Sequence, residues 1–305
     1  MENKNIPNLF ILGAPKSGTT ALSEYLRNHP NIFFSRIKEP HYFNFDAKKG
    51  YEIDLKTYLS LFKDADPHVH KVIGEGSTAY LFSKIAVSEI IKFNSKAKFV
   101  VMLRNPVDLV YAWYSQKYYE GLETIGDFES AWRAEEERKK GKNIPRSCFD
   151  PAQLFYSEWG KLDEQIERLF SLARKENIKV IIFDDFVKDT KSVYEDVLAF
   201  LGVPSDNRQS FPVINESKKP KFVRLQPLFA YLINFMRGLR SMVGLNLGYG
   251  SGVFQNLLMA NSEPTVKSKL PDDFKSELKT YYRNTIINLS KLLNRDLAYW
   301  IEKSL

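Results

Sequence analysis

The segment LGAPKSGTTAL, residues 12–22, holds the residues whose types and spacing most clearly suggest chemistry. Gly13 and Gly18 are spaced as in the phosphate loop of kinases and nucleotide hydrolases, which reads Gly-x-x-x-x-Gly-Lys-Ser/Thr. Thr19 stands where that motif has its lysine, and Lys16 lies inside the loop instead. Glycines permit a tight turn and close approach to a ligand, and the ammonium group adds a full positive charge. The segment predicts an anion-binding loop, and the displaced lysine raises the question of which anion it holds.

The elements expected around this loop are those that such a site requires. An apolar strand is expected at residues 8–12, and the apolar spacing over residues 19–27 predicts a helix. Between a strand and a helix, backbone N–H groups and the helix dipole face the ligand. The hydroxyls of Ser17, Thr19 and Thr20 add further donors. An ordinary glycine-containing turn is the alternative, but few such turns concentrate lysine, serine, glycine and two threonines.

Beyond the loop, strand and helix patterns alternate along the chain. Short apolar runs predict strands at residues 32–34, 71–74, 98–103 and 179–183. Amphipathic spacing predicts helices at residues 55–62, 83–93, 128–140, 162–175, 192–201 and 274–293, with an aromatic-rich helix after Pro106. We therefore expect an α/β fold with a doubly wound, mainly parallel sheet and a helical C-terminal part. Residues 1–305 are expected to form one domain, because no repeat or low-complexity linker divides them.

The composition restricts the partners and the compartment. The 305 residues carry a formal net charge of +7, which suits an anionic ligand. Nucleic acid is not expected, because basic and acidic residues are interleaved, as where KKGK (139–142) follows EEE (135–137). The single cysteine, Cys148, cannot form an internal disulfide, which favours a reducing compartment. No stretch reaches the roughly 18 apolar residues of a membrane span. We expect a cytoplasmic protein without stable membrane insertion.

Several motifs extend the pattern beyond the first loop and resemble those of a known family. They are PKSGTT (15–20), KEPHYF (38–43), GEGSTAY (74–80), LRNPVDLVYAWY (103–114), FDDF (183–186) and LLNRDLAYW (292–300). Through these motifs the chain resembles the sulfotransferases that use 3′-phosphoadenosine 5′-phosphosulfate (PAPS), in particular bacterial ones related to the carbohydrate sulfotransferase branch. The resemblance covers nearly the whole chain, with the motifs in the family's order.

The resemblance implies that PAPS is the co-substrate and that adenosine 3′,5′-bisphosphate (PAP) is the product. It places six loop residues at the donor, namely Pro15, Lys16, Ser17, Gly18, Thr19 and Thr20. Lys16 would stabilise the charge that builds on the departing phosphate. Arg104 would bind the 3′-phosphate through its planar guanidinium, with a surface salt bridge as the alternative. Sulfuryl donors have no obligatory metal, so we expect no metal site.

The second motif supplies the expected catalytic groups. The resemblance places the catalytic carboxylate on Glu39, which would act as the general base for the acceptor. The alternative is that Glu39 only pairs with Lys38 or caps a turn. His41 is a second candidate base, although a lone histidine is more often structural. Lys38 is expected to orient Glu39 or to touch the sulfuryl group.

Two positions depart from the family pattern. Ala112 stands where the family usually has a serine that donates to the 3′-phosphate, and Ser115, one helical turn on, could replace it only imperfectly. Lys219, with its neighbours in NESKKPK, is the candidate to complete that site, although lysine clusters are usually only solvated. Gly76 stands where glycan sulfotransferases often carry a catalytic lysine. A close match to heparan-type enzymes is therefore not expected.

The acceptor is expected to be a glycan or a small molecule with a hydroxyl or an amine. Residues 226–255 lie outside the donor motifs and are expected to form an acceptor-side or lid insertion, a contact in a homo-oligomer, or a membrane-surface element; core packing is the default. The aromatic residues after Pro106 could line an acceptor or adenine pocket, with core packing again as the alternative. Two rival functions remain, a P-loop kinase or nucleotide hydrolase and a non-catalytic anion-binding module. The apolar run KVIIFDD (179–185) imitates a strand that ends in a metal-holding aspartate, as the first rival would require.

Overall fold

The computed structural model describes residues 5–46, 53–214, 218–220, 226–228, 230–232, 262–264 and 269–302. The chain divides into two compact units, each made of two separate stretches. The first unit comprises Met1–Arg104 and Gln165–Asn215, and the second comprises Asn105–Glu164 and Glu216–Leu305. The prediction that residues 1–305 act as one domain stays a prediction.

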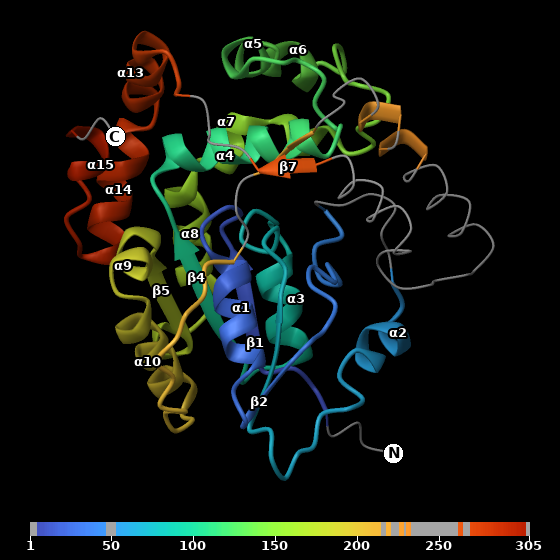
Figure 1. Ribbon diagram of the computed structural model, residues 1–305, viewed down its shortest axis with the longest axis vertical. Coiled ribbons are helices and arrows are strands. Elements are labelled where there is room, and N and C mark those ends of the chain that lie inside the picture. The colour runs from blue at the N-terminus through green and yellow to red at the C-terminus, as the bar shows by residue number, and fades with distance from the viewer. Residues whose placement is uncertain are drawn as a thin grey trace. The chain divides into compact units, whose positions relative to one another are not determined.

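A parallel sheet forms the centre of the first unit (Figure 1). Its strands are β1 (Leu9–Gly13), β2 (Ile32–Phe34), β3 (Val72–Gly76), β4 (Lys98–Leu103) and β5 (Ile178–Ile182). The order is β2-β3-β1-β4-β5, and every pair is parallel. The chain leaves β1 toward β2 and leaves β4 toward β5, so the strand order reverses between β1 and β4. Ligands of such sheets bind outside the carboxyl ends of the strands at this point, where the glycine loop and Arg104 begin.

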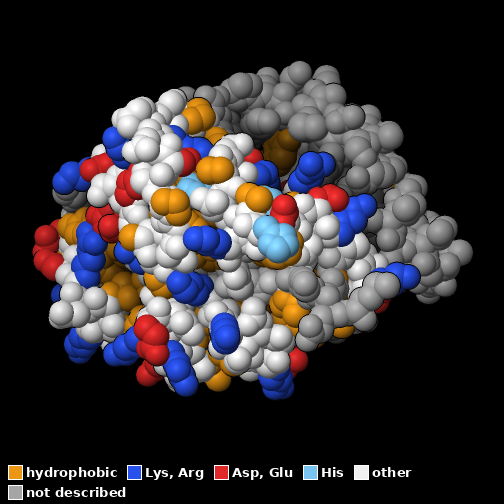
Figure 2. All heavy atoms as spheres, turned by 90° about the horizontal axis from the view of Figure 1, so that it is seen from below, with side chains coloured by type: hydrophobic (Ala, Val, Ile, Leu, Met, Phe, Trp, Pro, Cys, Tyr) orange, Lys and Arg blue, Asp and Glu red, His pale blue; other side chains and the backbone are white. Residues whose placement is uncertain are grey.

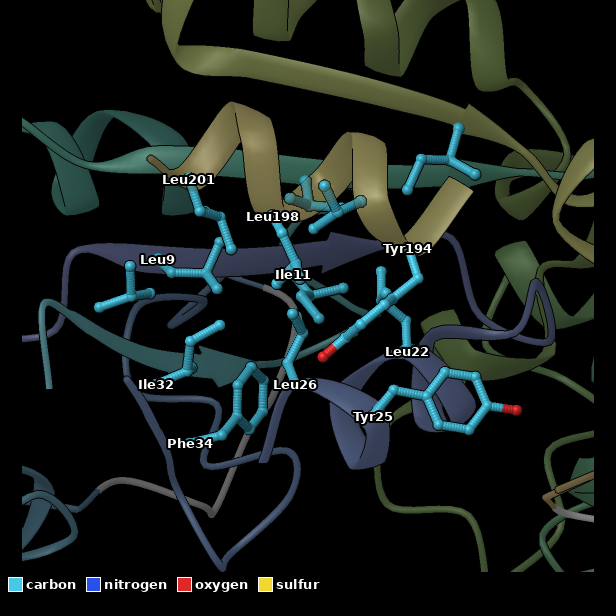
Figure 3. Packing of buried hydrophobic residues seen from close by; sticks show 14 of the residues in the cluster. Leu9, Ile11, Leu22, Tyr25, Leu26, Ile32, Phe34, Tyr194, Leu198 and Leu201 are labelled. Atoms are coloured by element: carbon cyan, nitrogen blue, oxygen red, sulfur yellow. The ribbon is translucent and has the colours of Figure 1, made fainter. Parts of the chain in front are cut away.

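Helices α1 (Thr19–Arg27) and α10 (Thr190–Leu201) cover one face of this sheet (Figure 3). Because side chains alternate across a strand, Leu9 and Ile11 share this face. They belong to one buried cluster with Leu22 and Leu26 of α1 and Leu198 of α10. Burial of these apolar side chains provides the main force that holds α1, and the loop before it, against β1.

Aromatic side chains pack against the other face of β1. The ring of Phe43 lies 5.9 Å from that of Phe10 in β1 and 5.3 Å from that of Phe93, the last residue of α3 (Ala86–Phe93). Tyr58 of α2 (Leu55–Ser60) lies 5.4 Å from Phe43. Phe43, which lies two residues after His41, thus anchors the chain that follows β2 to this face of the sheet.

The second unit is mainly helical. It contains α4 (Pro106–Tyr119), α5 (Phe128–Arg133), α6 (Glu135–Lys139), α7 (Tyr156–Trp159), α13 (Asp272–Tyr281), α14 (Arg283–Leu293) and α15 (Tyr299–Glu302). A short antiparallel pair, β6 (Lys218–Pro220) with β7 (Ser262–Pro264), adds to them. Helix α8 (Leu162–Leu172) begins in the second unit and continues into the first. Aromatic rings of Phe128, Tyr156 and Phe274 pack together between these helices.

Several predicted boundaries were wrong. The helix expected at residues 274–293 is two helices that meet at Tyr282, whose buried hydroxyl donates to the carbonyl of Ser157 (3.1 Å). The helix expected at 128–140 is likewise divided, between α5 and α6, at Ala134. The strand expected at 179–183 ends at Ile182, because Phe183 begins α9 (Phe183–Lys188). Most of residues 226–255 lie outside the described part of the chain.

The charge distribution follows the sequence pattern on the face that Figure 2 shows. Lysine and arginine side chains are scattered there among acidic, apolar and neutral ones. In the described residues, no helix combines the length and the apolar character that crossing a membrane needs.

Candidate active site

Both glycines of the first loop occupy positions that reject a side chain. Gly13 ends β1 with φ 138°, and a Cβ atom there would lie 2.6 Å from the carbonyl oxygen of Thr78. Gly18 has φ 87° and precedes α1, and its Cβ would lie 3.0 Å from the ring of Phe183. Left-handed conformations of this kind cost glycine little. The loop can therefore turn tightly between β1 and α1.

The N-terminus of α1 carries neither a side-chain cap nor an acidic residue in its first turn. The first amides of a helix have no partner within the helix and carry partial positive charge. Ser17 and Thr19 are buried, Thr20 is half-buried, and Lys16 is exposed with φ 61°. The buried Ser17 hydroxyl donates to the carbonyl of Pro15 (3.3 Å), which braces the loop. This helix end has the features of an anion site.

Arg104 follows β4 and reaches the same loop. Its Nη1 donates to the carbonyl oxygen of Lys16 at 3.3 Å, and its guanidinium lies 5.0 Å from the centre of the Phe183 ring. Stacking on an aromatic ring orients the planar guanidinium. A second cation is thus brought to the anion loop from a strand that lies about ninety residues further along the chain.

The other residues predicted for the 3′-phosphate lie in the second unit. Ala112 is buried in α4 and has no polar side-chain atom to offer. The Ser115 hydroxyl donates to the carbonyl of Tyr111 at 2.8 Å, so it is engaged within α4. Lys219 lies in β6, but its side chain is outside what the structure describes. Of the residues predicted to bind the 3′-phosphate, Arg104 is therefore the one whose basic side chain the structure describes.

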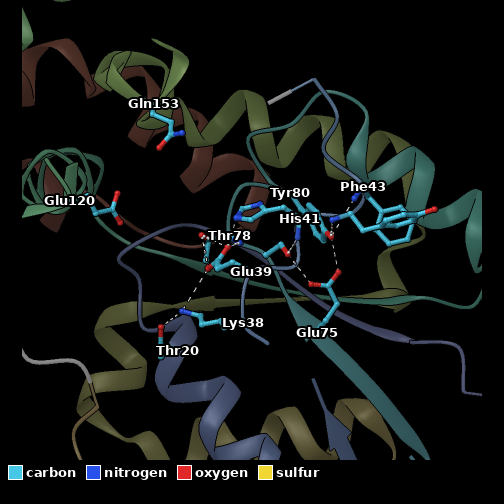
Figure 4. A network of polar contacts seen from close by, with 12 residues as sticks. Thr20, Lys38, Glu39, His41, Phe43, Glu75, Thr78, Tyr80, Glu120 and Gln153 are labelled. Atoms are coloured by element: carbon cyan, nitrogen blue, oxygen red, sulfur yellow. Dashed lines mark hydrogen bonds and ion pairs between the residues drawn. The ribbon is translucent and has the colours of Figure 1, made fainter. Parts of the chain in front are cut away.

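Glu39 accepts hydrogen bonds from Thr78 and lies beside His41 and Lys38 (Figure 4). Its carboxylate accepts from the Thr78 amide (2.7 Å) and from the Thr78 hydroxyl (3.0 and 3.1 Å). The Nε2 atom of His41 lies 3.3 Å from one carboxylate oxygen, and Nζ of Lys38 lies 3.7 Å from the other. The Glu39 side chain as a whole remains 19% exposed.

Lys38 connects this carboxylate to the anion loop. Its Nζ donates to the Thr20 hydroxyl in the first turn of α1 and also pairs with Glu39 (Figure 4). The loop and the carboxylate come from different segments of the chain, yet one ammonium group contacts both. The structure thus brings together the predicted residues Lys38, Glu39, His41 and Thr20.

Glu75 is the site-adjacent residue that the sequence interpretation missed. It lies in β3, is fully buried, and accepts from the hydroxyls of Ser77 (2.9 Å), Tyr80 (2.8 Å) and Tyr58 (3.2 Å). Burial raises the pKa of its carboxyl from 4.5 to about 7, although these hydrogen bonds oppose the rise. A glutamate within the apolar run KVIGEG was the available signal.

Two further sequence features have structural explanations. Asp184 and Asp185 lie in the first turn of α9 rather than at the end of a strand. Among the described residues, no three His, Cys, Asp or Glu side chains gather as a metal site would require.

In α4, Trp113 packs 4.5 Å from Trp159, and the buried Tyr114 donates to the carbonyl of Ile125 (3.0 Å). Core packing, the alternative for the aromatic residues, therefore accounts for these two rings.

Comparison with known proteins gives one family and several relatives. The family described as "Sulfotransferase domain" matches residues 7–222. The bifunctional heparan sulfate N-deacetylase/N-sulfotransferase 4 of Mus musculus is 24% identical over 99% of this chain and 32% of its own length. Carbohydrate sulfotransferase 15 of Mus musculus is 29% identical over 36% of this chain and 27% of its own length. The chain thus spans about a third of the length of these curated relatives.

A solved structure matches nearly end to end. The crystal structure of a sulfotransferase from Alicyclobacillus acidocaldarius is 26% identical, with a TM-score of 0.69. The match covers 97% of this chain and 98% of the other. The arrangement of the sheet and its flanking helices is therefore shared with that protein.

Proposed function

Starting from the fact that this chain belongs to the sulfotransferase family, we propose that it moves a sulfuryl group from PAPS to an acceptor hydroxyl or amine. The product of the donor is PAP, and no metal takes part. The observation that carries the proposal is the contact of Lys38 with both Thr20 of the anion loop and Glu39. Through this contact, only the Lys38 side chain separates the proposed proton acceptor, the Glu39 carboxylate, from the proposed anion site.

The donor is held by the first loop. The amides at the start of α1, with the hydroxyls of Thr19 and Thr20, bind the 5′-phosphate. Lys16 supplies positive charge to the departing phosphate. Electrostatic stabilisation lowers the barrier most at the atoms on which charge develops in the transition state. Arg104 binds the 3′-phosphate, supported by its position beside the carbonyl of Lys16.

The reaction is an in-line displacement at sulfur. The acceptor oxygen or nitrogen forms a bond to sulfur while the bond from sulfur to the bridging phosphate oxygen breaks. The acceptor proton passes to the Glu39 carboxylate, and the electron pair of the broken bond stays on the phosphate of PAP. Thr78 and His41 hold the Glu39 carboxylate in place for this transfer. Lys38 reduces the electrostatic repulsion between the Glu39 carboxylate and the negatively charged donor.

A glycan is the first acceptor class to test, since the printed names of relatives refer to heparan sulfate and to carbohydrate. Small molecules with a hydroxyl or amine are the second class. Gly76, in place of the lysine expected of glycan enzymes, leaves Lys16 and Lys38 as the proposed cations at the sulfuryl group. The cytoplasmic location and the homo-oligomer stay predictions.

The test follows PAP formation from PAPS in a panel of glycan and small-molecule acceptors. We expect turnover that persists in EDTA. Glu39→Gln should lower kcat by about 10² or more, the usual contribution of a general base, while calorimetry shows unchanged PAP affinity. Glu89→Gln, on the surface of α3 where Glu89 pairs with Lys92, is the matched control and should retain full activity. Absence of both turnover and PAP binding would refute the proposal, whereas an active Glu39→Gln variant would refute only the base.

A further inference from the structure

We propose that Glu75 is a positioning residue that fixes the backbone of residues 39–43, and with it the carboxylate of Glu39, through the hydroxyls of Ser77 and Tyr80. The inference rests on the proposed function for its catalytic meaning. Its structural part concerns the shape of one loop and can be tested without any turnover.

The loop requires such support because its backbone is strained. Glu39 has φ 59° and His41 has φ 54°, and neither is glycine. Side chains seldom adopt this left-handed region, so two such residues in three positions persist only where the surroundings hold them. The carbonyl of Gly76 accepts from the Glu39 amide (3.0 Å), and further contacts must fix the residues that follow.

Two hydroxyls hold the backbone amides of those residues (Figure 4). The Ser77 hydroxyl accepts from the His41 amide at 3.0 Å. The Tyr80 hydroxyl accepts from the Tyr42 amide at 3.0 Å and, at 3.4 Å, from that of Phe43. These are contacts between β3 with its following turn and the loop that carries Glu39.

The Glu75 carboxylate decides how these hydroxyls are oriented. A hydroxyl has one proton to donate and two lone pairs with which to accept. Ser77 gives its proton to Oε2 of Glu75, and Tyr80 gives its proton to Oε1. Above its raised pKa of about 7, Glu75 is ionised. Because an ionised carboxylate only accepts, both protons then point toward Glu75 and both sets of lone pairs remain for the loop amides.

A neutral amide in place of Glu75 would break this arrangement. The side chain of glutamine has one acceptor oxygen and one NH₂ donor. Since Ser77 and Tyr80 donate to different carboxylate oxygens, the NH₂ group would face one of the two hydroxyls. That hydroxyl would then accept from the glutamine with one lone pair and lose the acceptor that fixes its proton. Its other lone pair would no longer be oriented toward the loop amide, so that contact would weaken.

Tyr58 supplies a matched control. Its buried hydroxyl also donates to Oε1 of Glu75 (3.2 Å), as that of Tyr80 does, but only Tyr80 also accepts from loop amides. Removal of either hydroxyl removes one donor to the same carboxylate. The ring of Tyr58 stacks on that of Tyr42 (4.3 Å between centres), and Tyr58→Phe retains this ring contact.

The experiment measures amide hydrogen exchange of residues 41–43 together with kcat and PAP affinity, at a pH above the raised pKa of Glu75 so that its carboxylate is ionised. In Tyr80→Phe, Ser77→Ala and Glu75→Gln we expect exchange about tenfold faster and kcat about tenfold lower, the effect of losing one hydrogen bond. PAP affinity should stay within about twofold of wild type, since the donor loop is untouched. Tyr58→Phe should match wild type within about twofold in exchange of this segment and in kcat.

Three outcomes would overturn the inference. The first is wild-type exchange at residues 41–43 in Glu75→Gln, or in both Tyr80→Phe and Ser77→Ala. The second is equal effects of Tyr58→Phe and Tyr80→Phe, which would indicate a general loss of core packing. The third is faster exchange with unchanged kcat, which would remove the catalytic meaning. If the wild-type protein transfers no sulfuryl group, the proposed function fails, and the exchange data alone decide whether Glu75 positions the loop.

Discussion

Two buried glutamates, one in each unit, are held in opposite ways. The Glu123 carboxylate in the second unit accepts hydrogen bonds from Nη1 and Nη2 of Arg138 (2.7 and 2.8 Å) and from the hydroxyl of Tyr156 (2.6 Å). The amides of Thr124 (2.8 Å) and Ile125 (2.9 Å) also donate to it. The Glu75 carboxylate in the first unit accepts hydrogen bonds only from neutral hydroxyls, and no lysine or arginine among the described residues pairs with it.

The difference indicates different uses of the same side chain. A buried charge that is paired and saturated with hydrogen bonds joins elements of structure, and breaking the pair is costly. A buried carboxylate held by hydroxyls alone keeps a raised pKa and a smaller net contribution to stability. Such a group is a candidate for a functional role, here the orientation of the neighbouring hydroxyls.

The largest effect should come from breaking the ion pair of the second unit. Arg138→Met leaves the Glu123 carboxylate buried and without its cation, so we expect a loss of about 3–5 kcal/mol in the free energy of unfolding. Urea unfolding followed by circular dichroism measures this loss. Arg133→Met is the control, since Arg133 pairs with Glu277 where both side chains are about half exposed. An exposed pair should contribute at most about 1 kcal/mol, so equal losses in the two variants would contradict the comparison.

An intermediate effect should appear in the pH dependence of stability. Burial raises the pKa of Glu75 from 4.5 to about 7, so between these values the folded protein holds a proton that the unfolded chain has released. Stability therefore falls as the pH rises through this range, by up to about 1.4 kcal/mol per pH unit from this group. Glu75→Gln cannot titrate and should show a flatter curve from pH 5 to pH 8. Parallel curves for the variant and the wild type would show that Glu75 keeps an ordinary pKa.

The smallest effect should come from one donor to Glu75. Tyr58→Phe removes the 3.2 Å hydrogen bond to this carboxylate and should cost about 1 kcal/mol. Because this bond lowers the pKa of Glu75, its loss raises that pKa further, and the cost should be greater above pH 7 than at pH 5. Unfolding at the two pH values provides the measurement. A greater cost at pH 5 would contradict the assignment of Tyr58 as a donor to the carboxylate.

Much of the fold follows from local patterns in the sequence. The run KFVVML predicted β4 with its observed limits, and NLFIL predicted β1 within one residue at each end, because a buried parallel strand is continuously apolar. The position of the glycine loop between β1 and α1 was also predictable, since glycine spacing and polar side chains mark it. The α/β fold and the family membership inferred from the ordered motifs are confirmed.

The candidate site could be predicted only in part. Glu39, Lys38 and Arg104 were selected through motifs, but their contacts with Thr78, Thr20 and the Lys16 carbonyl join distant positions in the chain. No local pattern reports such contacts. The division of the C-terminal helix at Tyr282 was not predicted either, and the hydroxyl of this residue donates to a carbonyl 125 residues away in the chain.

The sequence by itself predicted a loop for an anion and the side chains that are proposed to move a proton. Glycine positions, apolar strands and charged residue types are local properties, and they fix the elements and the chemistry available. The tertiary structure alone decided the environment of Glu75. Its burial and its three hydroxyl partners arise when β3, α2 and the turn after β3 pack together, and that burial is the physical cause of its raised pKa.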